Sequence, residues 1–224
     1  MWNLNIDYKI MRSHKVTEVR NLTPSTYIIQ MEKNDFTFTT GQYITLGFTG
    51  SIDRREYSIY SSENDKYLEV LIKEVDEGLV SKKLKRCKPG DYLDVDGPFG
   101  HFSLQESELE TKKFLFIATG TGISPIHSFI VTHPELNYTV LHGVRKENEA
   151  YERDEYKNGN YILCTSREES GNFHGRVTEY LKQNPVSSDT ICYLCGNCHM
   201  IYEAYDILEK QGITLGPVHT EVYF

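Results

Sequence analysis

The sequence predicts two units, an antiparallel β-barrel or sandwich over residues 1–105 and an α/β unit with a parallel sheet over residues 112–224. In the first part, short apolar or alternating runs are separated by turn residues, which is typical of antiparallel strands. In the second part, compact apolar runs alternate with Gly-rich turns and amphipathic stretches, which is typical of parallel strands covered by helices. A polar, charged segment, residues 105–112, connects the two.

Each unit can be divided into expected elements. In the first unit we expect strands over 26–31, 43–48, 57–60 and 67–75, one short helix over 80–87, and the end of the series at 97–100. In the second unit we expect strands over 114–118, 138–143, 161–164, 190–195 and 218–223, and helices over 150–156, 177–181 and 200–208. A further helix is expected to have Ser124 as its N-cap and Pro125 as its first residue.

Composition excludes several classes of protein. The 24 Lys and Arg residues against 32 Asp and Glu give a net charge of −8, which argues against nucleic acid or an acidic membrane as the main partner. No apolar run approaches the roughly 18–20 residues of a membrane span. Met1–Lys9 lacks the pattern of a signal peptide, so a cytoplasmic protein with five reduced cysteines is expected.

A Gly-rich segment, 118–125, follows an expected buried strand and opens a helix. Glycines let a ligand approach the backbone, and the helix N-terminus offers free N–H groups to a phosphate. The segment is neither the dinucleotide-binding fingerprint nor a P-loop. It therefore predicts either a nucleotide site or only a tight strand-to-helix turn.

Three polar clusters are further candidates. Strand alternation directs Arg55 and Tyr57 to one face, where they suit a flat anionic ligand or form an ordinary exposed strand face. Ser166, Arg167 and Arg176, with Arg145, suit a phosphate monoester at the edge of the sheet, or are surface arginines on loops. The last cluster resembles a metal-ligand run, although a shared metal is disfavoured because its members fall on different elements; it comprises Cys192, Cys195, Cys198 and His199.

The chain ends in Glu221-Val222-Tyr223-Phe224, directly after an apolar strand pattern. Chain ends are normally frayed and variable, so two terminal aromatic residues indicate a docked tail. Packing of an edge strand is the alternative.

Taken together, these segments resemble the ferredoxin/flavodoxin–NADP reductase superfamily over roughly residues 14–224, with the bacterial type as the nearest match. Members combine an antiparallel FAD-binding barrel with a parallel-sheet NADP-binding domain. The resemblance implies a flavoprotein that transfers hydride from NADPH to FAD and passes electrons to ferredoxin or flavodoxin.

For the flavin, the family motif R-x-Y-S matches Arg55-Glu56-Tyr57-Ser58. The resemblance implies that Arg55 holds the flavin phosphate, Tyr57 stacks on the flavin ring and Ser58 lies near N5. A second motif matches residues 78–81, whose amides would hold the pyrophosphate. The implied flavin residues are Arg55, Glu56, Tyr57, Ser58, Leu71, Ile72, Lys73, Gly78, Leu79, Val80 and Ser81.

For the nicotinamide nucleotide, the family motifs G-T-G-x-x-P and C-G-N-x-x-M match residues 120–125 and 195–200, with Cys198 where Pro is common. The resemblance implies that Cys195 lies near the nicotinamide and that Ser166, Arg167 and Arg176 hold the 2′-phosphate. The implied nucleotide residues are Thr119, Gly120, Thr121, Gly122, Arg145, Ser166, Arg167, Arg176, Gly196 and Asn197.

At the end of the chain, the resemblance implies that Tyr223 covers the flavin ring and Phe224 packs on the FAD adenine. Ser58, Cys195 and Glu221 would position the reactants or handle protons, which makes them, with Tyr223, the candidate catalytic residues. No resident metal is implied.

The electron acceptor is inferred from the resemblance and from one basic segment. A basic segment could dock an acidic ferredoxin or flavodoxin, or be a solvated helix face; it comprises Lys82, Lys83, Lys85, Arg86 and Lys88. Two other functions remain open. One is an NAD(P)H-dependent flavin reductase or the reductase component of another redox enzyme. The other is a non-catalytic nucleotide- or metal-binding module.

Overall fold

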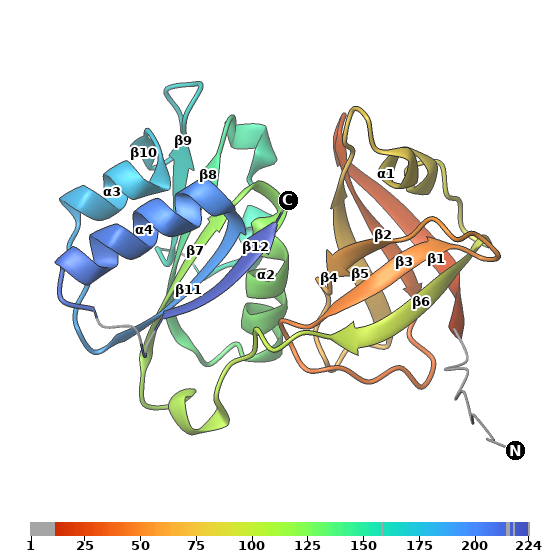
Figure 1. Ribbon diagram of the computed structural model, residues 1–224, viewed down its shortest axis with the longest axis horizontal. Coiled ribbons are helices and arrows are strands. Elements are labelled where there is room, and N and C mark those ends of the chain that lie inside the picture. Colours follow the sequence, from red (N-terminus) through yellow and green to blue (C-terminus); the bar gives the residue numbers. More distant parts are fainter. Residues whose placement is uncertain (1–11, 158, 214–215, 217, 224) are drawn as a thin grey trace, which may run out of the picture.

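The computed structural model describes residues 12–157, 159–213, 216 and 218–223, which form two six-stranded sheets side by side (Figure 1). The connector between the sheets contains the short 3-10 turn η1 (Glu106–Glu108). Among the described residues, no helix combines the length and apolar character needed to cross a membrane.

The first sheet is antiparallel throughout, in the order β4-β3-β6-β1-β2-β5. A bridge between Ile59, just beyond β4, and Val70 of β5 closes it into a barrel, and Tyr60 N donates to Glu69 O at 2.8 Å beside it. Alternating apolar side chains from all six strands fill the interior. The elements are β1 (Arg12–Thr23), β2 (Thr26–Glu32), β3 (Tyr43–Phe48), β4 (Arg55–Ser58), β5 (Tyr67–Lys73), α1 (Leu79–Leu84) and β6 (Tyr92–Phe99).

The second sheet is parallel throughout, in the order β10-β9-β8-β7-β11-β12. From β7 the chain first proceeds to β8 and β9, and later returns to the other side of β7 with β11 and β12. The direction therefore reverses between β7 and β11, where sheets of this kind open a crevice for ligands. The strands are β7 (Lys113–Thr119), β8 (Asn137–Val144), β9 (Tyr161–Thr165), β10 (Phe173–His174), β11 (Thr190–Asn197) and β12 (Val218–Tyr223).

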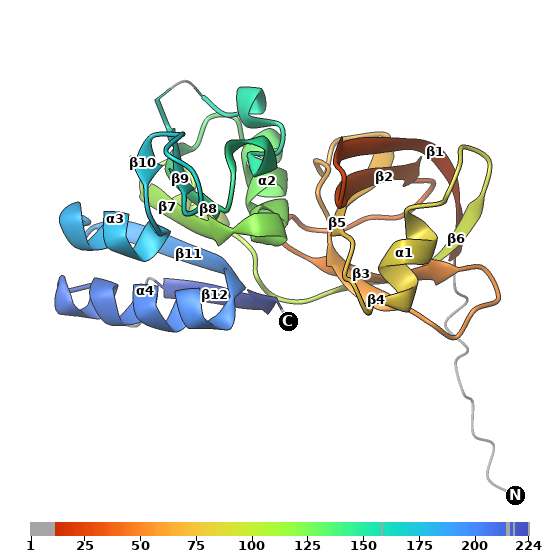
Figure 2. The ribbon, with the colours of Figure 1, turned by 90° about the horizontal axis from the view of Figure 1, so that it is seen from above.

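Three helices cover the two faces of this sheet. Helix α2 (Ile123–Thr132) lies on the face toward the barrel, whereas α3 (Val177–Gln183) and α4 (Cys198–Lys210) cover the opposite face (Figure 2). The end of β12 lies between the two sheets in both views (Figures 1 and 2). Both expected architectures are therefore confirmed, and the last strand brings the end of the chain to the barrel.

Contacts across the junction fix the two sheets relative to one another. His127 of α2 bonds to Tyr60 O through Nδ1 at 2.8 Å, and Ser128 Oγ donates to Ser61 O at 2.7 Å. Arg20 of β1 bridges Glu69 of the barrel and Glu152 of the parallel-sheet unit, at 2.6 and 2.9 Å.

Two local expectations were wrong. Helix α2 begins at Ile123 with Gly122 as its N-cap, because the 3-10 turn η2 (Gly120–Gly122) continues directly into it. The expected helix over 150–156 is instead η4 (Arg153–Glu155), preceded by η3 (Glu147–Glu149), since Glu152 adopts a left-handed φ of 46° that interrupts a helix. The segment 97–100 ends the series of barrel strands as expected, since β6, the last of them, runs to Phe99.

Candidate functional site

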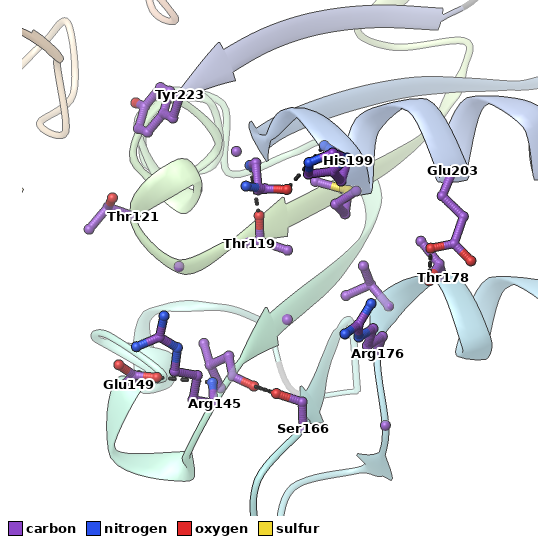
Figure 3. A pocket seen from close by; sticks show the side chains of 18 of the residues that line it. Thr119, Thr121, Arg145, Glu149, Ser166, Arg176, Thr178, His199, Glu203 and Tyr223 are labelled. Carbon is purple, nitrogen blue, oxygen red and sulfur yellow. Dashed lines mark hydrogen bonds between the residues drawn. The ribbon is translucent and has the colours of Figure 1, made fainter.

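The main cavity opens at the carboxyl ends of the parallel strands, where the order of the sheet reverses. It has a volume of about 700 Å³, and its wall combines backbone of the Gly-rich segment with cationic and anionic side chains. In Figure 3, Thr121 and Tyr223 lie toward one end and Arg176 and Glu203 toward the other. The lining residues are Lys73, Thr119, Gly120, Thr121, Gly143, Val144, Arg145, Glu149, Ser166, Gly175, Arg176, Val177, Thr178, Gly196, Asn197, His199, Met200, Glu203 and Tyr223.

Two glycines let the Gly-rich segment pack directly against the end of β11. A Cβ atom on Gly122 would lie 2.5 Å from Cys195 O, and one on Gly196 would lie 2.3 Å from Thr119 Oγ1. Gly196 also has a φ of 132°, which side chains rarely adopt. The predicted motifs around 120 and 196 are thus parts of one wall of the cavity.

Hydrogen bonds fix this wall further. Thr119 Oγ1 accepts from Asn197 N at 3.1 Å, and the Asn197 side chain accepts from His199 N at 3.0 Å as the N-cap of α4. Gly120 has a φ of 55° and open space where a Cβ would point. The backbone here is accessible to a ligand, as the Gly-rich sequence predicts.

The predicted phosphate clamp is only partly assembled. Arg145, Ser166 and Arg176 line the cavity, and Ser166 Oγ donates to Val144 O at 3.3 Å. Arg167 is exposed and absent from the lining, although its N–H donates to Arg145 O at 3.0 Å. Of these two neighbours in sequence, only Ser166 borders the cavity.

A second group of predicted residues meets where β11 and β12 reach the barrel. Ser58 Oγ donates to Glu221 Oε2 at 3.2 Å, and Cys195 Sγ lies 3.8 Å from the same oxygen. The Tyr223 ring is partly exposed and lines the cavity, whereas its hydroxyl is buried. All four candidate catalytic residues therefore share one cluster, although Ser58 and Glu221 are 163 positions apart.

The cluster is poorly solvated, which alters its titration. Burial raises the pKa of Glu221 to about 7, against the opposing hydrogen bonds from Ser58 and Cys195. Burial also raises the pKa of the Cys195 thiol and of the Tyr223 phenol well above their usual ranges. At neutral pH, Cys195 and Tyr223 are neutral, and Glu221 is divided between its two forms.

The residues of the predicted flavin motif lie on β4, beside this cluster. Arg55 and Glu56 are exposed, Tyr57 is partly buried against the barrel interior, and Ser58 is buried. The Arg55 guanidinium donates only to the neighbouring Arg54 O, at 2.7 Å, among the contacts of the described residues. An exposed cation and a partly exposed ring are thus available to a ligand on this strand.

The other predicted flavin residues divide into two sets. The side chains of Leu71 and Ile72 are buried in the two cores, so only their backbone can reach a ligand. Lys73 lines the main cavity and pairs with Glu149 at 3.2 Å. Of the short α1 segment, Gly78 precedes the helix, Leu79 is exposed, Val80 is buried, and Ser81 Oγ accepts from Val75 N at 3.1 Å. Phe224 lies outside the described residues.

Sequence reasoning missed several lining residues. Glu149 follows β8 and holds Arg145 N at 2.9 Å, whereas Glu203 of α4 pairs with Thr178 at 3.0 Å and Lys182 at 2.8 Å. Two of these residues, Gly143 and Gly175, could have been predicted from the sequence, because a glycine near the end of a strand indicates a close approach of another group to the backbone. The carboxylates could not, because charged residues on loops and helices are common.

Two domain models match the chain, in the order of the two sheets. The oxidoreductase FAD-binding domain matches residues 12–104, and the oxidoreductase NAD-binding domain matches residues 116–206. The chain belongs to the ferredoxin/flavodoxin–NADP reductase superfamily. Its barrel is thus an oxidoreductase FAD-binding domain, and its parallel-sheet unit is an oxidoreductase NAD-binding domain.

The relatives within the superfamily serve different partners. The chain is 28% identical over 88% of its length to the toluate 1,2-dioxygenase electron transfer component of Pseudomonas putida, and covers 63% of that protein, less than two thirds. It is 27% identical over 97% of its length to ferredoxin–NADP reductase of Azotobacter vinelandii, and covers 93% of it. The fold matches ferredoxin NADP+ reductase from Neisseria gonorrhoeae with bound FAD and NADP, with a TM-score of 0.86 and 21% identity, over 96% of this chain and 99% of that one.

Proposed function

We propose that the chain transfers hydride from NADPH to bound FAD and passes the electrons to a ferredoxin or flavodoxin. The observation that carries this proposal is the meeting of Ser58 from the barrel with Cys195, Glu221 and Tyr223 from the parallel sheet. A site for reaction between two cofactors has to lie where the two binding units touch. We assign residues 1–105 to the flavin domain and 112–224 to the nucleotide domain.

The barrel side of this cluster fits a flavin. Arg55 offers an exposed guanidinium, Tyr57 a partly exposed ring, and Ser58 a hydroxyl at the junction. Gly78 precedes α1 without a side-chain cap, which leaves backbone amides for phosphate oxygens. We therefore propose that the flavin ring lies along β4 against Tyr57, with its phosphates near Arg55 and Gly78.

The main cavity fits a nicotinamide dinucleotide. Its volume of about 700 Å³ is within the range of ligand pockets, and Arg145, Arg176 and Lys73 supply positive charge along it. Arg176 and Ser166 suit a 2′-phosphate, which supports NADPH as the donor. Tyr223 and Thr121, at one end, would then border the nicotinamide.

The bound cofactors supply the hydride donor and its acceptor. The chain has to align them and to exclude water. Tyr223 would cover the flavin ring until the nicotinamide displaces it, and Ser58 would donate a hydrogen bond at the reacting edge. Because burial raises the pKa of Glu221 to about 7, its carboxyl group can hold or release a proton beside Ser58 and Cys195.

An acidic electron-transfer protein is supported as the acceptor by the basic segment on and after α1. Among the described residues, Lys82 forms no ion pair and donates to the backbone carbonyl of Asp76, whereas Lys83 pairs with Asp53 at 3.7 Å. Lys85, in contrast, is held by Glu74 at 2.6 Å. The exposed Leu79 adds an apolar contact next to these cations. We propose that this surface docks the acceptor.

A second candidate function is supported by other observations. Glu149 and Glu203 also line the cavity, and their charges oppose a 2′-phosphate. The similarity to a dioxygenase electron transfer component points in the same direction. The alternative is an NADH-dependent reductase that serves another redox enzyme.

Stopped-flow bleaching of the bound flavin by NADPH and by NADH tests the proposal. We expect NADPH to reduce the flavin with the higher ratio of rate to dissociation constant. Reduction mainly by NADH would favour the second function, and a colourless protein that binds neither nucleotide would refute both. Adding ferredoxin, flavodoxin or free flavin as acceptor then separates the acceptor classes.

A further inference from the structure

His142 lies beneath the Gly-rich segment, in the centre of the parallel sheet. It is a fully buried residue of β8, paired in register with Ala118 of β7 and Leu163 of β9. Its Nε2 atom is 2.8 Å from Gly120 O, and its Nδ1 atom is 2.5 Å from the hydroxyl of Tyr161. The imidazole therefore connects a buried phenol with the backbone of the cavity wall.

The partners determine which nitrogen carries the proton. The Gly120 carbonyl can only accept, so Nε2 must be the donor. Burial lowers the pKa of His142 to about 4, so the neutral ring has its one proton on Nε2. Nδ1 then accepts from Tyr161, whose phenol pKa is raised by burial and which therefore remains a donor. Hydrogen bonding runs in one direction, from Tyr161 through His142 to Gly120.

This chain of hydrogen bonds fixes one peptide group at the cavity. In a trans peptide, the carbonyl of one residue and the N–H of the next point in opposite directions. Because Gly120 O points inward to His142, the N–H of Thr121 points outward, and both Gly120 and Thr121 line the cavity. Gly120 O also accepts from Ile123 N, the backbone hydrogen bond of η2, so His142 adds a second donor that holds this carbonyl, and with it the Gly120–Thr121 peptide, in place.

We propose that His142 is a positioning residue that holds the Thr121 N–H toward an acceptor oxygen of the bound nicotinamide nucleotide. This inference rests on the proposed location of the nucleotide in the main cavity. His142 itself touches neither nucleotide nor flavin. Tyr161 supports it from the far side of the ring.

The test uses the flavin-loaded protein and measures flavin bleaching by whichever nucleotide the wild type oxidises. His142→Leu removes the donor to Gly120, and we expect the nucleotide dissociation constant to rise roughly tenfold. His142→Gln returns an N–H donor and is expected to stay within about threefold of the wild type. Tyr161→Phe, the milder change, keeps the imidazole and is expected to raise the constant about threefold.

A matched control separates positioning from general destabilisation. Leu141, next to His142, is equally buried but packs on the opposite face of the sheet. Leu141→Ala is expected to lower the thermal midpoint and to leave nucleotide affinity within about twofold. Wild-type affinity in His142→Leu and Tyr161→Phe would overturn the inference, as would a Gln variant as weak as the Leu variant. A wild-type flavin that neither nucleotide bleaches would overturn the proposed function and, with it, this inference.

Discussion

Glu221 is the residue on which the chemistry of the junction depends most. It accepts from Ser58, lies 3.8 Å from Cys195 Sγ, and has a pKa raised to about 7 by burial. The neighbouring Cys195 and Tyr223 remain neutral through the physiological range, because burial raises their pKa values. Glu221 is thus the group of this cluster that can exchange a proton near neutral pH.

The titration of Glu221 has a consequence for stability. Its pKa is about 7 in the folded chain against 4.5 for the unperturbed group. Between pH 4.5 and about 7 the folded state therefore binds more protons than the unfolded state. The contribution of Glu221 to stability is fully present below pH 4.5 and is lost as the pH rises toward about 7. Glu221→Gln does not titrate. We expect its unfolding free energy to exceed that of the wild type increasingly as pH rises, by on the order of 2 kcal/mol above neutrality.

Thermal unfolding of the flavin-free protein, measured across this pH range, checks the expectation. Glu209→Gln, an exposed change on α4, is the control and should follow the wild-type curve. If the stability of Glu221→Gln changed with pH in the same way as that of the wild type, the raised pKa of Glu221 would be contradicted.

Arg176 and Arg167 make a second test at the residue scale, because only Arg176 lines the cavity. If Arg176 holds the 2′-phosphate, Arg176→Ala should lower the ratio of NADPH to NADH efficiency by roughly tenfold or more, the loss of a charge-assisted hydrogen bond. Arg167→Ala should change that ratio less than about threefold. Steady-state kinetics with NADPH and with NADH measures this ratio. A larger effect of Arg167→Ala than of Arg176→Ala would assign the 2′-phosphate to Arg167 instead.

At the scale of elements, the site depends on how closely two strand ends approach. Thr119 at the end of β7 and Gly196 at the end of β11 are in contact, and a Cβ on Gly196 would lie 2.3 Å from Thr119 Oγ1. Asn197 then donates to the same oxygen at 3.1 Å. The two strand ends approach this closely because residue 196 has no side chain.

Gly196→Ala should therefore be unusually disruptive for a single added methyl group. The clash and the φ of 132° each oppose the substitution, and we expect a loss of about 3 kcal/mol in unfolding free energy together with weaker nucleotide binding. Gly50→Ala is the control, since φ is 80° there but nothing lies within 4 Å of the added atom. It should cost about 1 kcal/mol. Equal effects in denaturant unfolding would exclude the close approach as the cause.

At the scale of the whole molecule, function requires that the two units keep a fixed relation and leave a surface for the acceptor. The contacts of His127, Ser128 and Arg20 across the junction hold the two units in a fixed relation. The docking surface for the acceptor has to be locally basic, because the protein as a whole has a net charge of −8 and would repel an acidic acceptor elsewhere.

Reversing the charge of that surface tests docking. We expect Lys82→Glu with Lys83→Glu to lower the rate of ferredoxin or flavodoxin reduction roughly tenfold at low salt, with a smaller effect at high salt. Flavin reduction by the nucleotide should be unchanged, as it does not involve the acceptor. Lys210→Glu, at the end of α4 on the other unit, is the matched charge control. An unchanged rate and salt dependence in the double variant would remove this surface from the proposal.

Most of the architecture could be predicted from the sequence because hydrophobic periodicity is local. Strands β3 and β12 have the predicted bounds, and the remaining predicted strands are displaced by a few residues at most. The helix expected over 150–156 could not be excluded locally, because the left-handed conformation of Glu152 accompanies its pairing with Arg20, 132 positions away.

The sequence by itself determined the two units, their order, the Gly-rich segment and the family motifs, since each depends on residues close together in the chain. Only the tertiary structure showed that Ser58 meets Glu221, that Arg176 lines the cavity while Arg167 does not, and that His142 anchors Gly120. Those relations depend on strand order and on the direction in which each loop leaves the sheet. A local pattern does not encode them, because they arise when distant segments pack together.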